Sequence, residues 1–195
     1  MNNVIHPWKR GALAAIAVLG LAGAACGDGG SNEATPTGGV TGGASFAAPV
    51  DGTNALVAVV VNPGDRRVLA YLCDGATLST WFTGDADPDG TVSLTATNGA
   101  RLSGRIEGSK LVGTVTPAGE ASAHAFSAQT VSAPAGLYRA KGEVGGQAAI
   151  GGWVVLADGR QTGRVTTSSG FTSSDTDLAR PPKPVTSFTS TEVDF

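Results

Sequence analysis

Cysteine and charged residues are scarce in this chain, and each shortage excludes a class of protein. Two cysteines in 195 residues are too few for a disulfide scaffold. Charged residues make up only 15% of the chain, and acidic side chains outnumber basic ones. Residues 1–25, which are expected below to be cleaved off, contain two basic residues, Lys9 and Arg10, and no acidic residue. The remaining chain has 11 basic and 16 acidic side chains and a net charge of −5. This balance argues against nucleic acid as a partner, because a basic patch is expected on such proteins.

Sequence motifs of catalysis are lacking as well. The chain contains no Gly-x-Ser-x-Gly nucleophile elbow and no His-Glu-x-x-His zinc helix. Beyond residue 25 there is one histidine, His124, in a strand-like setting. We interpret it as an ordinary strand residue and expect no enzyme, because a triad would need a serine and an aspartate to meet it in space. The pairs Gly145-Gly146 and Gly151-Gly152 are not phosphate loops, since no helix start follows them.

The N-terminal segment has the pattern of a secretory signal peptide. Lys9 and Arg10 form a short basic start, and residues 11–25 follow without a charge. These fifteen apolar or small residues are fewer than the roughly 20 that a membrane-spanning helix needs. We therefore expect residues 1–25 to be a signal peptide. The segment ends in Leu21-Ala22-Gly23-Ala24-Ala25-Cys26.

The stretch that ends at Cys26 resembles the lipobox of bacterial lipoproteins, with Gly23 where lipoboxes most often carry leucine. The resemblance implies cleavage before Cys26 and attachment of a lipid, such as palmitate, to its thiol. Two or three fatty chains hold a protein firmly on a membrane, since each buried methylene contributes roughly 0.8 kcal/mol. The expected location is the extracytoplasmic face of the cell membrane, with the lipid on Cys26 as the membrane contact. The alternatives are an ordinary secretory signal with a cysteine nearby and an uncleaved anchor.

Two further segments hold too few apolar residues for a core. Residues 26–54 consist mainly of Gly, Ala, Thr, Ser and Pro after the cysteine, and they are expected to form a flexible tether. A random coil of this length spans roughly 25–35 Å. Residues 168–195 return to Ser, Thr, Asp and Pro and are expected to be a C-terminal tail. Within this tail, residues 185–195 are interpreted as a loose end, with an edge strand as the alternative.

Residues 55–167 carry the signals of an all-β domain. Short apolar runs alternate with turn sequences, such as residues 62–65 and Asn98-Gly99, and no 3.6-residue apolar stripe is present. About eight to ten short strands predict a small antiparallel meander barrel or a β-sandwich. Successive hairpins favour an up-and-down meander.

Two neighbouring strands repeat the same pattern of leucine, glycine and a β-branched residue at alternate positions. The residues expected on one face are Leu102, Gly104, Ile106, Leu111, Gly113 and Val115. An inward-facing glycine makes room where a sheet curves. This pattern favours the barrel over the sandwich.

Three aspartates at alternate positions precede a glycine between residues 84 and 90, as at the start of a calcium loop. The twelfth position of that loop is Ala96 in place of the closing glutamate. We interpret the segment as a hairpin turn and assign no metal and no other cofactor to the chain, with calcium binding as the alternative.

Aromatic residues and the second cysteine complete the set of candidates. Trp81, Tyr138 and Trp153 would either line a pocket for a sugar or small ligand or fill the interior of a small barrel, and we favour filling. Cys73 lies in a strand-like run and is interpreted as a small buried hydrophobe, with a reactive thiol as the alternative.

These features favour a lipid-anchored cell-envelope lipoprotein. Its non-enzymatic β-domain is expected to bind a small ligand, an envelope polymer or another protein. Residues 135–139 and 151–159 resemble stretches of uncharacterised secreted proteins of actinobacteria, which implies no activity. The alternatives are an accessory subunit that docks on a membrane complex through a sheet edge, and a secreted hydrolase with an unrecognised site.

Overall fold

The computed structural model describes residues 43–173 and Val185, and these residues form twelve β-strands without a helix. The all-β class expected from the sequence is therefore confirmed. The described part of the chain offers no helix with the length and apolarity needed to cross a membrane. The predicted signal peptide, the lipidation site at Cys26 and residues 26–42 of the predicted tether lie outside the described residues. In chain order the strands are β1 Ala44–Pro49, β2 Leu56–Val61, β3 Arg67–Cys73, β4 Ser79–Asp85, β5 Thr91–Thr95, β6 Arg101–Glu107, β7 Lys110–Thr116, β8 His124–Thr130, β9 Gly136–Val144, β10 Gln147–Val155, β11 Gln161–Thr167 and β12 Gly170–Ser173.

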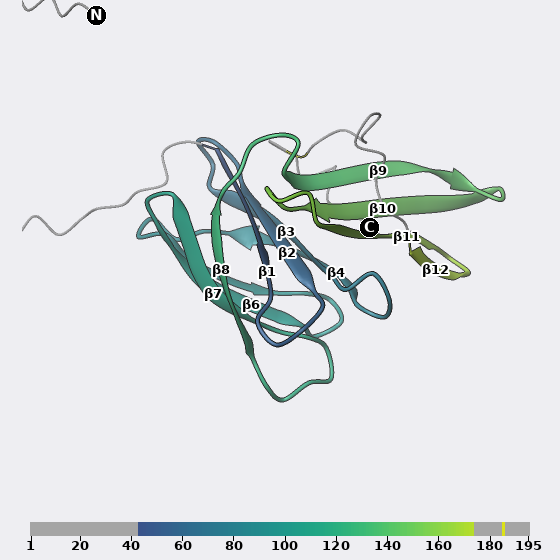
Figure 1. Cartoon of the computed structure of the whole chain (residues 1–195), viewed down its shortest axis with the longest axis horizontal. Helices are drawn as coiled ribbons and strands as arrows, with labels where there is room; N and C mark the ends of the chain where they lie inside the picture. The colour runs from purple at the N-terminus through teal and green to yellow at the C-terminus, as the bar shows by residue number, and fades with distance from the viewer. Residues whose placement is uncertain (1–42, 174–184, 186–195) are drawn as a thin grey trace, which may run out of the picture. The chain divides into compact units, whose positions relative to one another are not determined.

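Strands β1–β8 form one antiparallel sheet in the order β4-β3-β2-β1-β8-β7-β6-β5 (Figure 1). Almost every strand pairs with its neighbour in the chain, and the additional pairing of β1 with β8 curls the sheet into a barrel. The seam lies between β4 and β5, where Ala86 and Val92 form a single bridge. The up-and-down meander favoured by the sequence is confirmed, and the barrel is nearly closed.

The barrel interior is filled by side chains from alternate positions of all eight strands. Its largest members are Phe46, Phe82 and Phe126, each at most 1% exposed. Valine, leucine, isoleucine and alanine side chains occupy the remaining space. The barrel therefore has a packed core of its own.

The glycines predicted to face inward make room for this core. Gly104 and Gly113 lie directly opposite each other on β6 and β7. A Cβ atom on Gly113 would overlap the carbonyl oxygen of Ser103 and approach the ring of Phe126 to 3.0 Å. Only a glycine lets the two strands and the Phe126 ring come this close.

Strands β9–β12 form a second antiparallel sheet in the order β12-β11-β10-β9. This sheet covers the outer face of β2 and β3 through an apolar cluster to which it contributes Leu137 and Val154. The barrel side of that cluster includes alternate residues of the two strands, such as Val60 and Leu69. Every residue of β2 is consequently buried, as is every residue of β3 after Arg67. This double burial explains why β2 is continuously apolar, whereas β5 alternates between apolar and polar residues.

The expected domain boundaries are wrong at both ends. Ala44–Pro49, which the sequence analysis placed in the tether, forms β1 between β2 and β8 at the centre of the barrel sheet. Gly170–Ser173, expected in the tail, pairs with β11 as β12. At Val185 the backbone N–H donates a hydrogen bond of 2.7 Å to the carbonyl of Leu137. The sequence did not predict β1 because alanine and serine have a weak preference for strands. The strand forms because the edges of β2 and β8 supply its hydrogen-bond partners.

We expect a chain that begins at Gly43 to unfold cooperatively and a chain that begins at Ala55 not to do so. The shorter chain lacks β1, so the facing edges of β2 and β8 lose their hydrogen-bond partners and the core loses Phe46. Thermal unfolding of both chains, followed by far-ultraviolet circular dichroism, distinguishes them. Equal melting temperatures for the two chains would show that β1 is dispensable.

Candidate functional site

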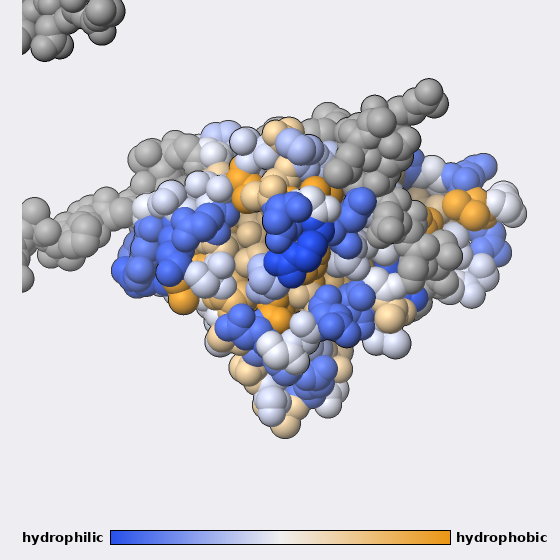
Figure 2. All heavy atoms as spheres, in the orientation of Figure 1, coloured by the Kyte–Doolittle hydropathy of each residue, from blue (hydrophilic) through white to orange (hydrophobic). Residues whose placement is uncertain are grey.

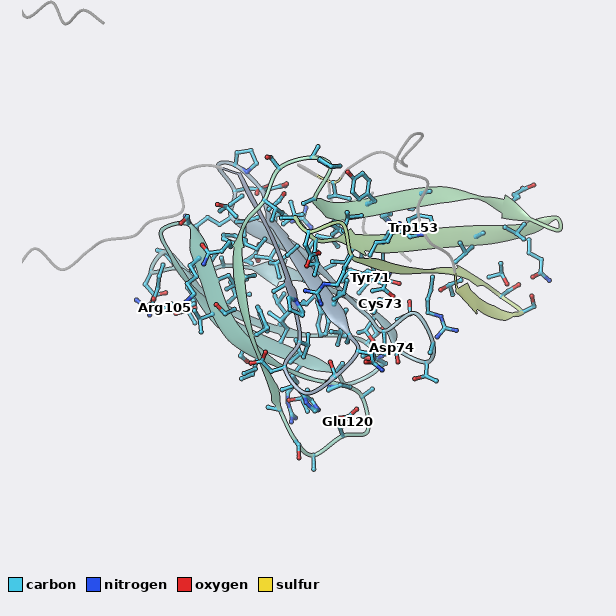
Figure 3. The ribbon with its side chains drawn as sticks, viewed as in Figure 1. Tyr71, Cys73, Asp74, Arg105, Glu120 and Trp153 are labelled. Atoms are coloured by element: carbon cyan, nitrogen blue, oxygen red, sulfur yellow. The ribbon has the colours of Figure 1, made fainter. Side chains whose placement is uncertain are left out.

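The barrel and the second sheet come into close contact at Gly152 of β10. A Cβ atom at this position would come within 2.5 Å of the Trp81 ring and 2.8 Å of the Tyr71 ring. The two rings belong to neighbouring positions on β3 and β4 and lie with their centroids 4.3 Å apart, tilted by 32°. Figure 3 shows Tyr71 where the barrel strands face the second sheet. The missing side chain at Gly152 thus lets an aromatic pair dock against the sheet backbone.

The adjacent Gly151 serves the opposite face of the same sheet. A Cβ atom there, or on Gly163, would overlap the indole of Trp153. Successive strand residues point to opposite faces, so the Gly151-Gly152 pair makes room for one aromatic group on each side of β10. This role is consistent with the expectation that the pair is not a phosphate loop.

Two arginines flank Gly152 on the face of the second sheet that meets the barrel. Arg139 of β9 and Arg164 of β11 are its direct cross-strand neighbours. The Cζ atom of Arg139 lies 5.6 Å from the centre of the Trp81 ring, a cation–π distance. Burial, followed by the neighbouring Cys73, raises the pKa of Tyr71 and outweighs the opposing effects of a hydrogen bond with Ser79 and of Arg164. Tyr71 is therefore a neutral hydrogen-bonding group at ordinary pH.

A cleft of about 470 Å³ opens beside Trp81, and both sheets line it. Its size falls in the range of small-molecule sites, about 300–1,000 Å³. The barrel contributes residues of β4 and of the β5–β6 turn, namely Ser79, Thr80, Trp81, Ala96, Thr97 and Asn98. The second sheet and its β11–β12 turn contribute Ala148, Ile150, Thr166, Thr167 and Ser168.

Part of the polar rim of this cleft is held in place by hydrogen bonds. The hydroxyls of Ser79 and Tyr71 are 2.9 Å apart, and the Asn98 amide donates to the Thr80 hydroxyl over 3.1 Å. The side-chain oxygen of Asn98 accepts a hydrogen bond from the backbone N–H of Ala100 at 3.1 Å. The polar groups beside Trp81 are therefore oriented by the barrel itself.

The three aromatic candidates from the sequence separate into two groups. Trp81 is half-buried and lines the cleft, as the pocket alternative expected. Tyr138 and Trp153 are buried in a small cluster on the other face of the second sheet, where the Tyr138 hydroxyl donates to the Pro134 carbonyl at 2.7 Å. Tyr138 and Trp153 thus fill a core, as favoured, but none of the three fills the barrel interior, so the expected place is wrong. Phenylalanines occupy that space instead.

The aspartate-rich segment forms a tight turn between β4 and β5. The N–H of Gly90, which has a φ of +85°, donates to the Asp87 carbonyl at 2.9 Å. The carboxylate of Asp89 accepts the backbone N–H of Thr91 at 3.0 Å and forms an exposed ion pair of 3.2 Å with Arg105. Hydrogen bonds from Thr91, with Arg105 nearby, lower the pKa of Asp89. Among residues 43–173 no three His, Cys, Asp or Glu side chains cluster in a way that would hold a metal ion.

His124 is the first residue of β8 and does not line the cleft beside Trp81. Its Nε2 atom is 3.0 Å from a carboxylate oxygen of Glu120 in the preceding loop. The hollow beside it, of about 290 Å³, contains Asp74 but is lined by no serine. The arrangement needed for a serine hydrolase is therefore not assembled around His124 within this hollow.

Cys73 is a buried free thiol at the junction of the two sheets, as expected for a small hydrophobe. Its sulfur accepts the backbone N–H of Gly75 at 3.3 Å and lies 3.9 Å from the Thr162 hydroxyl of β11. The side chain thus packs β3 against the second sheet.

Comparison of the chain with protein-family models, with curated proteins and with solved structures finds no match. The cleft residues are spread over turns and strands from Ser79 to Ser168. The sequence indicated Asn98 only as a turn residue and gave no sign that Thr97, Thr166 and Ser168 line a cleft. No spacing in the sequence connects these positions, because the docking of the two sheets brings them together.

Replacing Gly152 with alanine is expected to destabilise the domain by about 1–3 kcal/mol, the usual cost of overpacking. The added methyl group would push the second sheet away from Tyr71 and Trp81. Thermal unfolding would report the change. The matched control is Gly142→Ala in the same sheet, where a Cβ atom meets nothing within 4 Å. Equal melting temperatures for the two variants would show that the close approach at Gly152 is unimportant.

The loop after β3 provides a pH-dependent prediction. Asp74 accepts the backbone N–H groups of Ala76, Thr77 and Leu78 at 2.8 Å each. Partial burial alone would raise the pKa of Asp74, but these hydrogen bonds outweigh it and hold the pKa below its ordinary value of 3.8. Because the folded-state pKa is lowered, the carboxylate stabilises the fold above its ordinary pKa. This contribution is lost as the pH falls through the folded-state pKa.

Asp74→Asn should lower the free energy of unfolding at neutral pH by about 1 kcal/mol, a value reduced by solvent screening. The difference from the wild type should shrink as the pH falls below about 3.8. Denaturant unfolding at both pH values measures it. The control is Asp51→Asn, since the exposed carboxylate of Asp51 has no hydrogen-bond partner among the described residues. A difference that stays constant with pH would rule out the carboxylate as its source.

Proposed function

We propose that this protein is a lipid-anchored cell-envelope lipoprotein whose non-enzymatic β-domain binds a ligand in the cleft beside Trp81. The cleft carries the proposal, because it combines a half-buried indole with oriented polar groups from two sheets. Sites for small molecules generally have this composition, with apolar walls and a few placed polar groups. The anchor is inferred from the N-terminal pattern that ends at Cys26.

The surface of the described residues argues against an accessory subunit that docks through an apolar surface. An accessory subunit that docks through an apolar surface would expose a contiguous apolar patch. Among the described residues the exposed large hydrophobic side chains are Val112 and Val144, at 41% and 54% exposure. These two lie on different sheets, on β7 and at the end of β9. On the face in Figure 2, apolar residues likewise form separate small areas among polar ones.

Replacing Cys26 with serine should release the protein from membranes into the medium, because the lipid has no other attachment point in this proposal. Cell fractionation and the intact mass of the membrane-extracted protein test it. The wild type should begin at Cys26 and carry acyl mass, and the variant should carry none. A variant that stays on membranes would refute lipidation as the sole anchor.

A further inference from the structure

The chemistry of the described cleft lining favours a neutral ligand. Eleven of the described residues line the cleft, and none of these carries a charge. A charged group that entered would lose part of its hydration without meeting an opposite charge from these residues, which is costly. The remainder of the lining consists of hydroxyls, one amide, an indole and aliphatic side chains.

The polar groups of the cleft suit a ligand with many hydroxyls. The hydroxyls of Thr97, Thr166 and Ser168 have no hydrogen-bond partner within the described chain. Each can donate one hydrogen bond and accept others. The hydroxyls of a ligand have the same double capacity, so the two sets can pair in either direction. A ligand with only acceptors or only donors would use half of this capacity.

Trp81 provides the apolar complement. Its ring is positioned by the tilted ring of Tyr71 and by Arg139, and Ile150 lines the cleft from the second sheet. A pyranose or furanose ring has an apolar C–H face and a rim of hydroxyls. Such a ring would place its C–H face against the indole and its hydroxyls toward Asn98 and Thr166.

We propose that the cleft beside Trp81 binds a neutral saccharide, with the indole as the platform and Thr97, Asn98, Thr166 and Ser168 as hydrogen-bonding partners. The proposal rests on the proposed ligand-binding function and specifies the class of ligand. On the outer side of a cell membrane, such a ligand would be a neutral segment of an envelope glycan.

The test is titration calorimetry of the complete detergent-extracted protein with defined probes. The saccharide probes are neutral oligosaccharides of N-acetylglucosamine, mannose and arabinose. A sulfated oligosaccharide, palmitate and a neutral peptide serve as probes of other classes. We expect at least one neutral oligosaccharide to bind and the sulfated one not to bind. Absence of binding by all neutral oligosaccharides would overturn the proposal.

Variants then locate the site. Trp81→Ala should weaken saccharide binding about tenfold or more, equivalent to about 1.4 kcal/mol. Thr166→Val keeps the shape of the cleft and removes one hydroxyl, so it should weaken saccharide binding several-fold even if the Trp81 variant folds poorly. The matched controls Trp153→Phe and Thr83→Val lie outside the cleft and should leave the affinity unchanged. Unchanged binding in both Trp81→Ala and Thr166→Val would also overturn the proposal.

The same titrations separate this proposal from the broader one. Palmitate or the neutral peptide could bind with an affinity that depends on Trp81 and is not weakened by Thr166→Val. That result would overturn the saccharide assignment and support the ligand-binding function. If no probe binds, the saccharide assignment is overturned and the ligand-binding function loses its main support. Fluorescence of the Trp153→Phe protein provides an independent readout, because Trp81 is then the only tryptophan beyond residue 25.

Discussion

The structure depends on the burial of β2 and β3 from both sides. Their inward residues, such as Val59 and Ala70, belong to the barrel core, and their outward residues belong to the cluster beneath the second sheet. A strand with two apolar faces is stable only when both are covered, because exposed apolar area disfavours the folded state in water. The small second sheet is thus held against the barrel by the same two strands that organise the barrel core.

The cleft is a consequence of how the two layers meet. They touch closely where Gly152 has no side chain and Tyr71 and Trp81 project from the barrel. The lining beyond this contact consists of small polar and aliphatic side chains, from Ser79 on one wall to Thr166 on the other, which do not fill the space between the sheets. A contact point made by one glycine and two aromatic rings therefore produces a hollow beside it, and Trp81 is both part of the junction and part of the cleft wall.

Most of the fold was predictable from local patterns, whereas most of the cleft was not. Alternation in β5 and the glycines of β6 and β7 identified strands, faces and curvature, since these follow from period-two geometry. Trp81 was a candidate because an indole in a strand needs a partner or a ligand. Asn98 and Thr166 carried no such signal, because hydroxyl and amide residues are common in turns and on exposed strand faces. Their meeting depends on the docking of the second sheet.

The sequence by itself determined that this chain is all-β, where most strands and turns lie, and that its N-terminus resembles that of a lipoprotein. These features depend on neighbours in the chain, through side-chain alternation and turn chemistry. The tertiary structure alone decided that Ala44–Pro49 is a central strand, that phenylalanines rather than tryptophans fill the barrel, and that a neutral cleft lies beside Trp81. The physical reason is that strand pairing and sheet packing are long-range. A weak strand former is ordered by the edges on either side of it, and the face that a residue covers depends on which sheet packs against it.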